Sequence, residues 1–255
     1  GWYKGRVHGD IWGLTTDRIM QNVDEEMADQ SFYHPNWGPG DIIYKDLDGN
    51  GVIDEGSRTL DDHGDLSVIA NSTPKFNYSI MAGFKWKGFD FNMFWQGIGR
   101  RDFVASAQSE YFWGLMAAAN NSGLFKGGRM LDYWRPGNET NLLGANTDSY
   151  FPKPYSSTER NKNVQTQSRY VLNAAYLRLK NVQIGYTIPS QALDRVFIHS
   201  ARVYVSGENL LTFTKLPKMY EPETTMASNP ADGGVDMGEI YPINQMFSMG
   251  VNLTF

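Results

Sequence analysis

The sequence predicts an all-β fold of long antiparallel strands, and three observations support this prediction. Apolar and polar residues alternate with a period of two in several segments, which is the pattern of strands. Aromatic residues make up 14% of the chain although its mean hydropathy, −0.46, is polar. No run of about 18 apolar residues is present, so no transmembrane helix is expected.

A polar average combined with many aromatic residues is typical of a membrane β-barrel. The strands of such a barrel alternate lipid-facing and lumen-facing residues between aromatic girdles. A soluble β-sandwich that binds sugars has a similar composition, so composition leaves both architectures open.

Residues 1–73 are predicted to be irregular, with a single helical turn at Asp24–Ala28. Their turns are rich in Gly and Pro, as in Pro35–Gly40. Long connections without regular structure are uncommon in compact soluble domains but normal on the extracellular side of a barrel. We therefore expect residues 1–73 to form an extracellular loop region.

A hairpin is predicted at 74–97. One face of its two strands is apolar, and Met81 is the exception on the polar face; the apolar residues are Phe76, Tyr78, Ile80, Ala82, Phe84, Trp86, Phe89, Phe91, Met93 and Trp95. Lys87-Gly88 predicts a two-residue turn because Gly accepts a positive φ. Each strand has about ten residues, enough to cross a bilayer at a tilt.

Three more strands are predicted after a long loop at 98–168, which carries a short helix within Ala105–Ala119. The third strand spans 169–188. Its apolar phase slips near Lys180-Asn181, which predicts a β-bulge. The fourth strand spans 201–213, and a long loop at 214–243 leads to the last strand at 244–255.

Five strands do not close a wide barrel, and an open sheet would expose its edges and a lipid-facing surface. We therefore expect the sequence to be part of a longer protein, with further strands N-terminal to it. The segment 74–255 is interpreted as the C-terminal strands of a large antiparallel outer-membrane β-barrel with long extracellular loops.

The last residues resemble the C-terminal signal for assembly of outer-membrane barrels. Gly250 is followed by apolar residues at the third and fifth places, Leu253 and the final Phe255. A soluble β-protein can also end on a strand with Phe.

An Asp-rich loop at 46–54 matches the first nine positions of an EF-hand calcium loop. The expected ligands at positions 1, 3, 5, 7 and 9 are Asp46, Asp48, Asn50, Val52 through its main chain, and Asp54. Position 12 is Ser57 instead of the bidentate Glu, and Glu55, Asp61, Asp62 or Asp65 is a candidate replacement. A structural Ca²⁺ and a metal-free Asx-rich turn both fit this pattern.

Charge and motifs argue against two classes of function. The net charge of −5 provides no basic footprint for nucleic acid. The chain has no Cys, and its four His residues lack metal-ligand spacing. No nucleophile elbow, P-loop or zinc-protease motif is present, so we expect neither an enzyme nor an organic cofactor.

Aromatic residues in the predicted loops are candidates for stacking on a substrate or for contact with a partner. These residues are Trp12, Trp37, Tyr111, Trp113, Tyr133 and Trp134. Packing within the loops themselves is the alternative role for each of them.

Several stretches together resemble the SusC/RagA family of TonB-dependent outer-membrane transporters over nearly the whole chain. They are Pro39–Asp46 running into the Asp-rich loop, Thr73–Tyr78, Lys87–Phe91 with Phe94–Gly97, Tyr176–Asn181 with Gly185–Pro189, and Ser206–Leu210.

This resemblance implies a barrel of about 22 strands with a plugged lumen in the bacterial outer membrane. It also implies import of oligosaccharides or peptides with a SusD-like surface lipoprotein, and coupling to TonB–ExbB–ExbD through N-terminal parts that this sequence lacks. The short turns at Lys87-Gly88 and Ser190–Ser200 would be periplasmic, and the long loops extracellular.

Two other hypotheses compete with this interpretation. One is a soluble carbohydrate-binding β-domain with a calcium-supported loop. The other is an envelope enzyme acting on polysaccharide, which requires two carboxylates held at a fixed separation.

Overall fold

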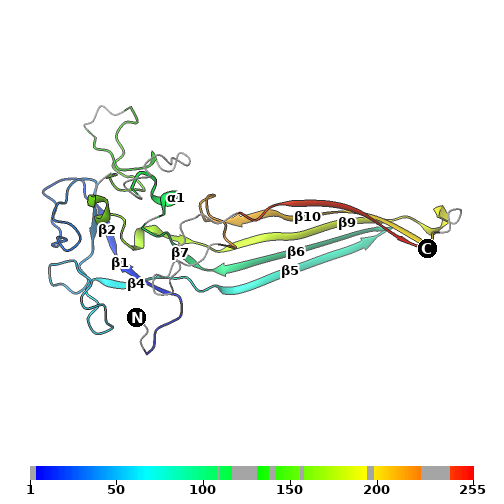
Figure 1. The fold of residues 1–255 in the computed structure, drawn as a ribbon, viewed down its shortest axis with the longest axis horizontal. Coiled ribbons are helices and arrows are strands. Elements are labelled where there is room, and N and C mark those ends of the chain that lie inside the picture. The colour runs from blue at the N-terminus through cyan, green and yellow to red at the C-terminus, as the bar shows by residue number, and fades with distance from the viewer. Residues whose placement is uncertain are drawn as a thin grey trace. The chain divides into compact units, whose positions relative to one another are not determined.

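The computed structural model describes residues 4–107, 109–116, 131–137, 142–155, 158–193, 198–224 and 242–255. It divides into two compact units (Figure 1). The first includes Gly1–Thr73 and Asp102–Leu172, and the second consists of Pro74–Arg101, Asn173–Thr224 and Tyr241–Phe255.

Across the described ranges, no helix has the length and apolar character needed to cross a membrane.

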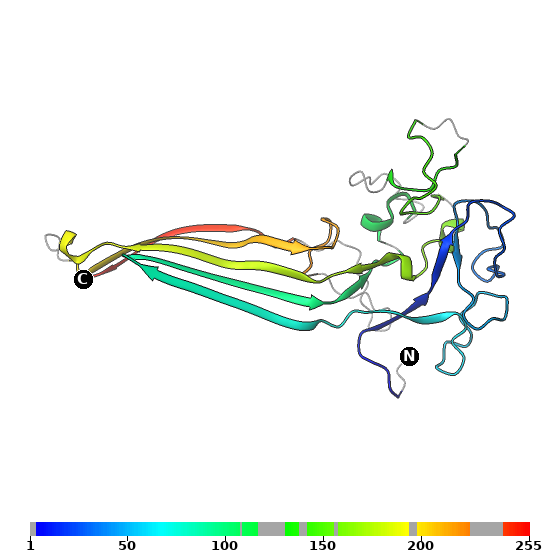
Figure 2. The ribbon, with the colours of Figure 1, turned by 180° about the vertical axis from the view of Figure 1, so that it is seen from behind.

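The second unit is a single antiparallel sheet of five strands in the order β11-β10-β9-β6-β5 (Figure 2). The strands are β5 (Lys75–Trp86), β6 (Phe89–Arg100), β9 (Tyr176–Thr187), β10 (Ser200–Thr214) and β11 (Met246–Thr254). This confirms the predicted hairpin and the three later strands. The third begins at Tyr176 instead of residue 169, because a 3₁₀ turn (Ser168–Tyr170) and the short strand β8 (Val171–Asn173) come first.

The turn between β5 and β6 is the predicted two-residue turn. Lys87 has φ 48° and Gly88 has φ 86°. Positive φ at both central residues defines the type I′ turn, whose twist matches that of the flanking strands.

The predicted β-bulge is confirmed at Lys180. Phe94 of β6 pairs with Asn181 and Trp95 pairs with Leu179, so Lys180 has no partner in that ladder. On the other side of β9, the register to β10 shifts between Glu208 and Leu211. The extra residue absorbs the phase slip seen in the sequence.

One face of the sheet is apolar from edge to edge because the pairing register aligns the apolar positions of all five strands. One row is Trp86, Phe89, Tyr186, Val203 and Val251, and the next is Phe84, Phe91, Ile184, Val205 and Met249. Many of these side chains are exposed, with Trp86 at 63% and Met249 at 84%. A large exposed apolar surface of this kind is what a lipid-facing barrel wall presents.

The first unit contains three pairs of short strands. β1 (Asp10–Leu14) pairs with β4 (Leu66–Asn71), β2 (Thr16–Ile19) with β3 (Ile42–Tyr44), and β7 (Asp102–Val104) with β8. The prediction that residues 1–73 are irregular is therefore wrong. These strands have three to six residues, and β3 is buried at every position, so no alternation marks them in the sequence.

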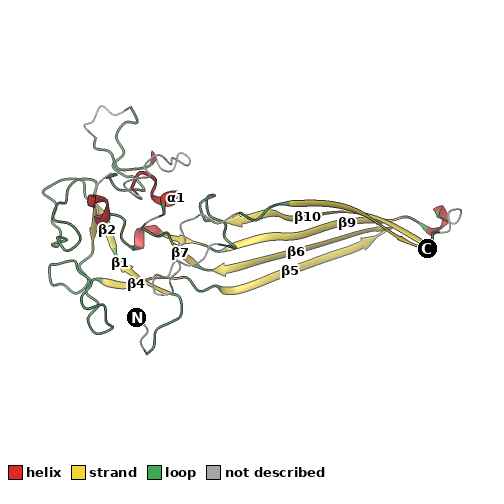
Figure 3. Cartoon of the chain, viewed as in Figure 1, coloured by secondary structure: helices red, strands yellow, loops and turns green. Residues whose placement is uncertain are grey.

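Helical structure among the described residues is limited to short turns (Figure 3). The stretch predicted to contain a helix holds one α-turn, α1 (Glu110–Trp113), continued by a 3₁₀ turn at Gly114–Met116. Residue 108 and residues 117–119 of that stretch lie outside the described residues. Asp24–Ala28 is not helical, because the Glu25 carboxylate accepts the backbone N–H groups of Gln21 and Asn22 and fixes a loop.

The core of the first unit combines aromatic packing with a buried polar network. Phe112, Trp113, Phe151 and Tyr170 pack edge to face or stacked.

Beside β3, the ammonium group of Lys162 lies 2.7 Å from the Asp41 carboxylate, and both side chains are buried. Asn163 donates to Asp41 and accepts from the backbone N–H of Ile42. Segments about 120 residues apart are thus joined by charge-assisted hydrogen bonds.

The assignment of the two sheet faces predicts that the same substitution has different costs at two neighbouring residues of one strand. Val205 lies on the apolar face and Ser206 on the polar face of β10. In the full-length parent protein refolded into lipid vesicles, Val205→Arg is expected to lower the unfolding free energy by about 2–4 kcal/mol if this row lies near the bilayer midplane. Ser206→Arg is the matched control and is expected to change it by less than half as much. Equal losses in denaturant titrations would contradict the assignment of faces.

Candidate functional site

The polar face of the five-stranded sheet carries two groups of charged side chains, and one of them is an ion pair that spans three strands. The guanidinium of Arg202 on β10 donates to Asp90 on β6 at 2.8 and 2.5 Å, and also to Gln183 on β9 at 2.9 Å. Gly185 of β9 lies between them. A Cβ there would collide with both charged groups, so the glycine makes the pair possible.

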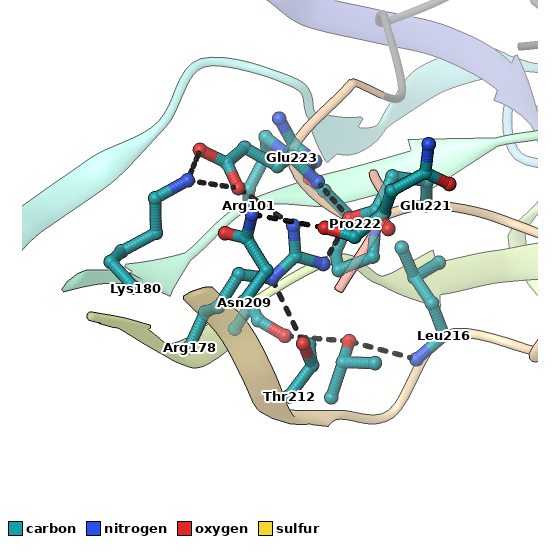
Figure 4. Close-up of polar contacts among 12 residues, drawn as sticks. Arg101, Arg178, Lys180, Asn209, Thr212, Leu216, Glu221, Pro222 and Glu223 are labelled. Carbon is teal, nitrogen blue, oxygen red and sulfur yellow. Dashed lines mark hydrogen bonds and ion pairs between the residues drawn. The ribbon is translucent and has the colours of Figure 1, made fainter. Parts of the chain in front are cut away.

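The second group, which we call the charged cluster, consists of Arg178 and Lys180 of β9 with Glu221 and Glu223 (Figure 4). Arg178 donates through Nη1 to Glu223 at 2.8 Å and through Nη2 to Glu221. Its Nε donates to the Thr212 hydroxyl at 2.9 Å. Lys180 contacts both carboxylate oxygens of Glu223, at 2.8 and 3.1 Å.

Burial makes the charged cluster energetically important. The side chain of Arg178 is only 4% exposed, whereas those of Lys180 and Glu223 are each 24% exposed. A buried guanidinium without its carboxylates would retain an uncompensated charge, which is strongly destabilising. The cluster therefore ties the two acidic residues firmly to the sheet.

The two acids belong to a segment, Leu216–Thr224, that follows β10 and lies in the predicted loop at 214–243. Leu216 and Tyr220 of this segment are buried. Arg101 donates to the carbonyl of Pro222, between the two acids. The sequence predicts only a loop here and does not reveal the charged cluster. The available signal was Arg178 and Lys180, which alternate with Leu177 and Leu179 on one strand.

In the first unit, the Asp-rich loop is held by hydrogen bonds from its own backbone. The Asp46 carboxylate accepts the N–H groups of Gly49 and Gly51, at 2.6 and 2.8 Å. These bonds, that of Gly51 first, hold the pKa of Asp46 below its ordinary value. Asp48 accepts from the N–H of Asn50 at 3.0 Å, and Asn50 accepts from that of Val52 at 2.7 Å.

A third carboxylate completes this arrangement. Oxygen atoms of Asp46, Asp48 and the buried Asp65 lie within 4.8 Å of one another. Asp65 accepts from the backbone N–H groups of Leu47 and Asp54, at 2.6 and 2.9 Å. Burial raises the pKa of Asp65 above its ordinary value. Asp54, expected at position 9, instead accepts the N–H of Gly56 at 2.7 Å.

The aromatic candidates fall into different environments. Trp113 and Trp134 are buried, and their indole N–H groups donate to the Ser106 carbonyl and the Gln21 side chain. Trp12, Trp37 and Tyr133 are half-buried; Trp12 lies against the His63 ring and Tyr133 beneath Arg135. The side chain of Tyr111 lies outside the described residues. Packing is therefore the role of Trp113 and Trp134, whereas Trp12, Trp37 and Tyr133 are only half-buried.

The terminal residues lie on or just after β11. Gly250 pairs with Tyr204, and a Cβ on Gly250 would meet the Tyr204 ring at 2.5 Å. The ring thus covers the glycine on the polar face. Leu253 is 48% exposed and Phe255 is 78% exposed.

Long antiparallel strands with one apolar face and one charged face are the pattern of strands in the wall of a membrane β-barrel. No family model matches the chain. It is 32% identical to TonB-dependent receptor P3 of Formosa agariphila over 99% of its own length and 22% of that receptor. TonB-dependent receptor P26 of the same organism is 24% identical over 85% of the chain and 20% of the receptor.

Solved structures give the same fold. A chain of the RagAB peptide transporter matches 96% of this chain with a TM-score of 0.54 and 20% identity, over 23% of its own length. The RagAB peptide importer in the "closed-closed" state also gives a TM-score of 0.54, with 19% identity and the same coverage of both chains.

These findings confirm the resemblance to TonB-dependent receptors and the all-β barrel fold of the RagA type. The chain spans about a fifth of the length of the curated relatives that it matches.

The burial of the aromatic candidates predicts which of them support the fold. Trp113→Ala is expected to lower the unfolding free energy of the first unit by about 3–5 kcal/mol, as for other large-to-small core substitutions. Hydrogen exchange of the parent protein, read on peptides from this unit, measures the loss. Trp12→Ala is the control and is expected to cost clearly less. Comparable losses would show that Trp12 is also a core residue.

Proposed function

We propose that the chain forms part of the wall and outer loops of a TonB-dependent outer-membrane transporter. Such a protein imports oligosaccharides or peptides together with a SusD-like surface lipoprotein. The observation that carries the proposal is the sheet with one exposed apolar face and one charged face. A soluble carbohydrate-binding domain would have to bury that apolar face.

Transport by such a protein is binding and gated passage, with no bond made or broken in the substrate. A substrate would be held by stacking and hydrogen bonds in a concave site among the outer loops. Energy from TonB–ExbB–ExbD would act through parts of the transporter outside these residues. The half-buried Trp12, Trp37 and Tyr133 are the candidates for stacking. The relation to TonB-dependent receptors supports a transporter over an enzyme.

The two candidate substrate classes have different support. The solved structures that share this fold are of a peptide transporter and a peptide importer. The support for oligosaccharides is the family resemblance found in the sequence. The charged cluster offers Arg178 and Lys180, which suit either a carboxylated sugar or a peptide.

Outer-membrane location and uptake together test this function. The full-length parent protein is expected in the outer-membrane fraction, and its electrophoretic mobility should depend on heating before analysis in detergent. A strain without the gene is expected to lose growth on an oligosaccharide mixture or on a peptide mixture, and the gene restores it. A co-purifying surface lipoprotein would identify the partner. A parent protein that is soluble without detergent would refute the proposal.

A calcium ion held by Asp46, Asp48 and Asp65 is a second proposal, for a structural role of the Asp-rich loop. Three carboxylates within 4.8 Å repel one another, and hard oxygen donors on a tight turn suit Ca²⁺. Asp65 was one of four sequence candidates for the missing carboxylate. A bound cation would offset both the repulsion and the cost of burying Asp65.

Calcium is therefore expected to protect residues 46–65 of the parent protein against proteolysis and hydrogen exchange. At 100 times the dissociation constant the stabilisation is about 2.7 kcal/mol. Asp48→Asn should remove most of it, and Asp61→Asn, an exposed carboxylate outside the group, should not. Equal protection in EDTA and in calcium would refute the site.

The raised pKa of Asp65 sets the sign of the pH dependence. Protonation of Asp65 competes with calcium, so protection by calcium should decline as the pH falls through that raised pKa. In EDTA the same acidification should stabilise the loop, because the neutral acid is the form that burial favours. The calcium and EDTA curves should therefore converge at low pH.

A further inference from the structure

The charged cluster has the composition of a ligand site. Its cations, Arg178 and Lys180, stand on β9, within the paired sheet. Its carboxylates, Glu221 and Glu223, stand on the segment that follows β10 (Figure 4). The cations are thus fixed by the strand ladder, and the anions are supplied by a loop. An external carboxylate of similar geometry would meet the same donors.

The donors are arranged for carboxylates in particular. Thr212 engages Nε of Arg178 at 2.9 Å and leaves both terminal nitrogens of the guanidinium for acceptors. Lys180 stands next to them because alternate residues of a strand share a face, so Lys180 lies on the same side of β9 as Arg178. A planar guanidinium beside an ammonium group matches carboxylates better than it matches neutral hydroxyl groups.

A second observation comes from β10, where the register shift places Asn209 and Leu210 opposite Lys180. Asn209 has φ 55°, in the left-handed region. Its buried Oδ1 finds no hydrogen-bond partner in the part of the chain that the structure describes. A buried polar atom without a partner calls for an explanation, and a bound ligand is one. A hydroxyl or amide N–H of a ligand would satisfy this oxygen.

The cluster is open to exchange on one side only. Arg178 is buried, but Lys180 and Glu223 are each 24% exposed. A ligand carboxylate that replaces Glu223 keeps every ion pair of Arg178 and Lys180. A neutral ligand that displaced Glu223 would leave these cations without a counter-charge, which is costly at a buried position.

We propose that Arg178, Lys180 and Asn209 form a binding site for a carboxylate of the transported substrate, and that Glu221 and Glu223 occupy this site in the ligand-free protein. The inference rests on the proposed transport function and names its substrate class: oligosaccharides that carry uronic acids, or acidic peptides. The segment Leu216–Thr224 then competes with the substrate for the two cations.

The test measures binding of four probes to the full-length transporter in detergent by calorimetry. The charged probes are trigalacturonate and tetraglutamate; the neutral probes are maltotriose and tetraglutamine. The double variant Glu221→Gln/Glu223→Gln removes the internal competitor and is expected to bind a charged probe at least tenfold more tightly. Lys180→Met, at a partly exposed position, is expected to bind it at least tenfold more weakly. Asp90→Asn, which alters the other ion pair on the same face, is the matched control and should leave the affinity unchanged.

The pattern across probes decides the outcome. Tighter binding of trigalacturonate alone supports a uronate substrate. Tighter binding of tetraglutamate alone supports an acidic peptide. Tighter binding of both supports a site that recognises the carboxylate itself. Three results would overturn the inference and leave the cluster as a loop anchor. They are changes in affinity below twofold, no binding of any charged probe, or equal changes in affinity for charged and neutral probes. Uptake of neutral substrates by the wild type would then show that the transport function stands without this site.

Discussion

The sheet depends on a single constraint: one pairing register must keep the apolar side chains of five strands on the same face. The sequence of β9 carries one residue more than strict alternation allows, and the bulge at Lys180 absorbs it. Without the bulge, a ladder that aligned Val182, Ile184 and Tyr186 with their neighbours would turn Leu177 and Leu179 to the polar face. Arg178 would then point toward the apolar side, where a charged group is costly.

The charged cluster follows from this constraint. Strand alternation puts Arg178 and Lys180 on one face, and the bulge makes that face the polar one. Two positive charges therefore stand side by side at a largely buried position, and the cost of burial has to be offset by carboxylates. Glu221 and Glu223 meet that need, and with them the segment Leu216–Thr224 becomes ordered over the sheet. A feature of strand register thereby fixes the conformation of a loop 43 residues further along the chain.

The sequence predicts those parts of the fold that depend on local pattern. Period-two alternation is sufficient for β5, β6, β10 and β11, the phase slip for the bulge, and Lys87-Gly88 for the turn. The short strands of the first unit could not be predicted, because their burial comes from partners far away in the chain, as when Lys162 meets Asp41. The candidate site divides in the same way. The spacing of Asp46 and Asp48 is local and visible in the sequence. The pairing of Arg178 with Glu221 is not, because the whole of β10 lies between the two residues.

The first unit shows why segments that look irregular in sequence can still present a fixed surface. Lys162 lies under Trp37 and Tyr155, at 5.5 and 4.4 Å from the ring centroids, while its ammonium group binds Asp41 and the carbonyl of Asn36. A buried charge with this many partners tolerates few alternative arrangements, since each lost partner leaves part of the charge unsatisfied. The indole of Trp37 is further fixed by its bond to the His34 carbonyl at 2.7 Å. An aromatic ring held in this way stacks on a ligand at a low entropic cost, because its orientation is set before binding. The network that fixes the orientation of Trp37 is therefore the one that holds the loops together.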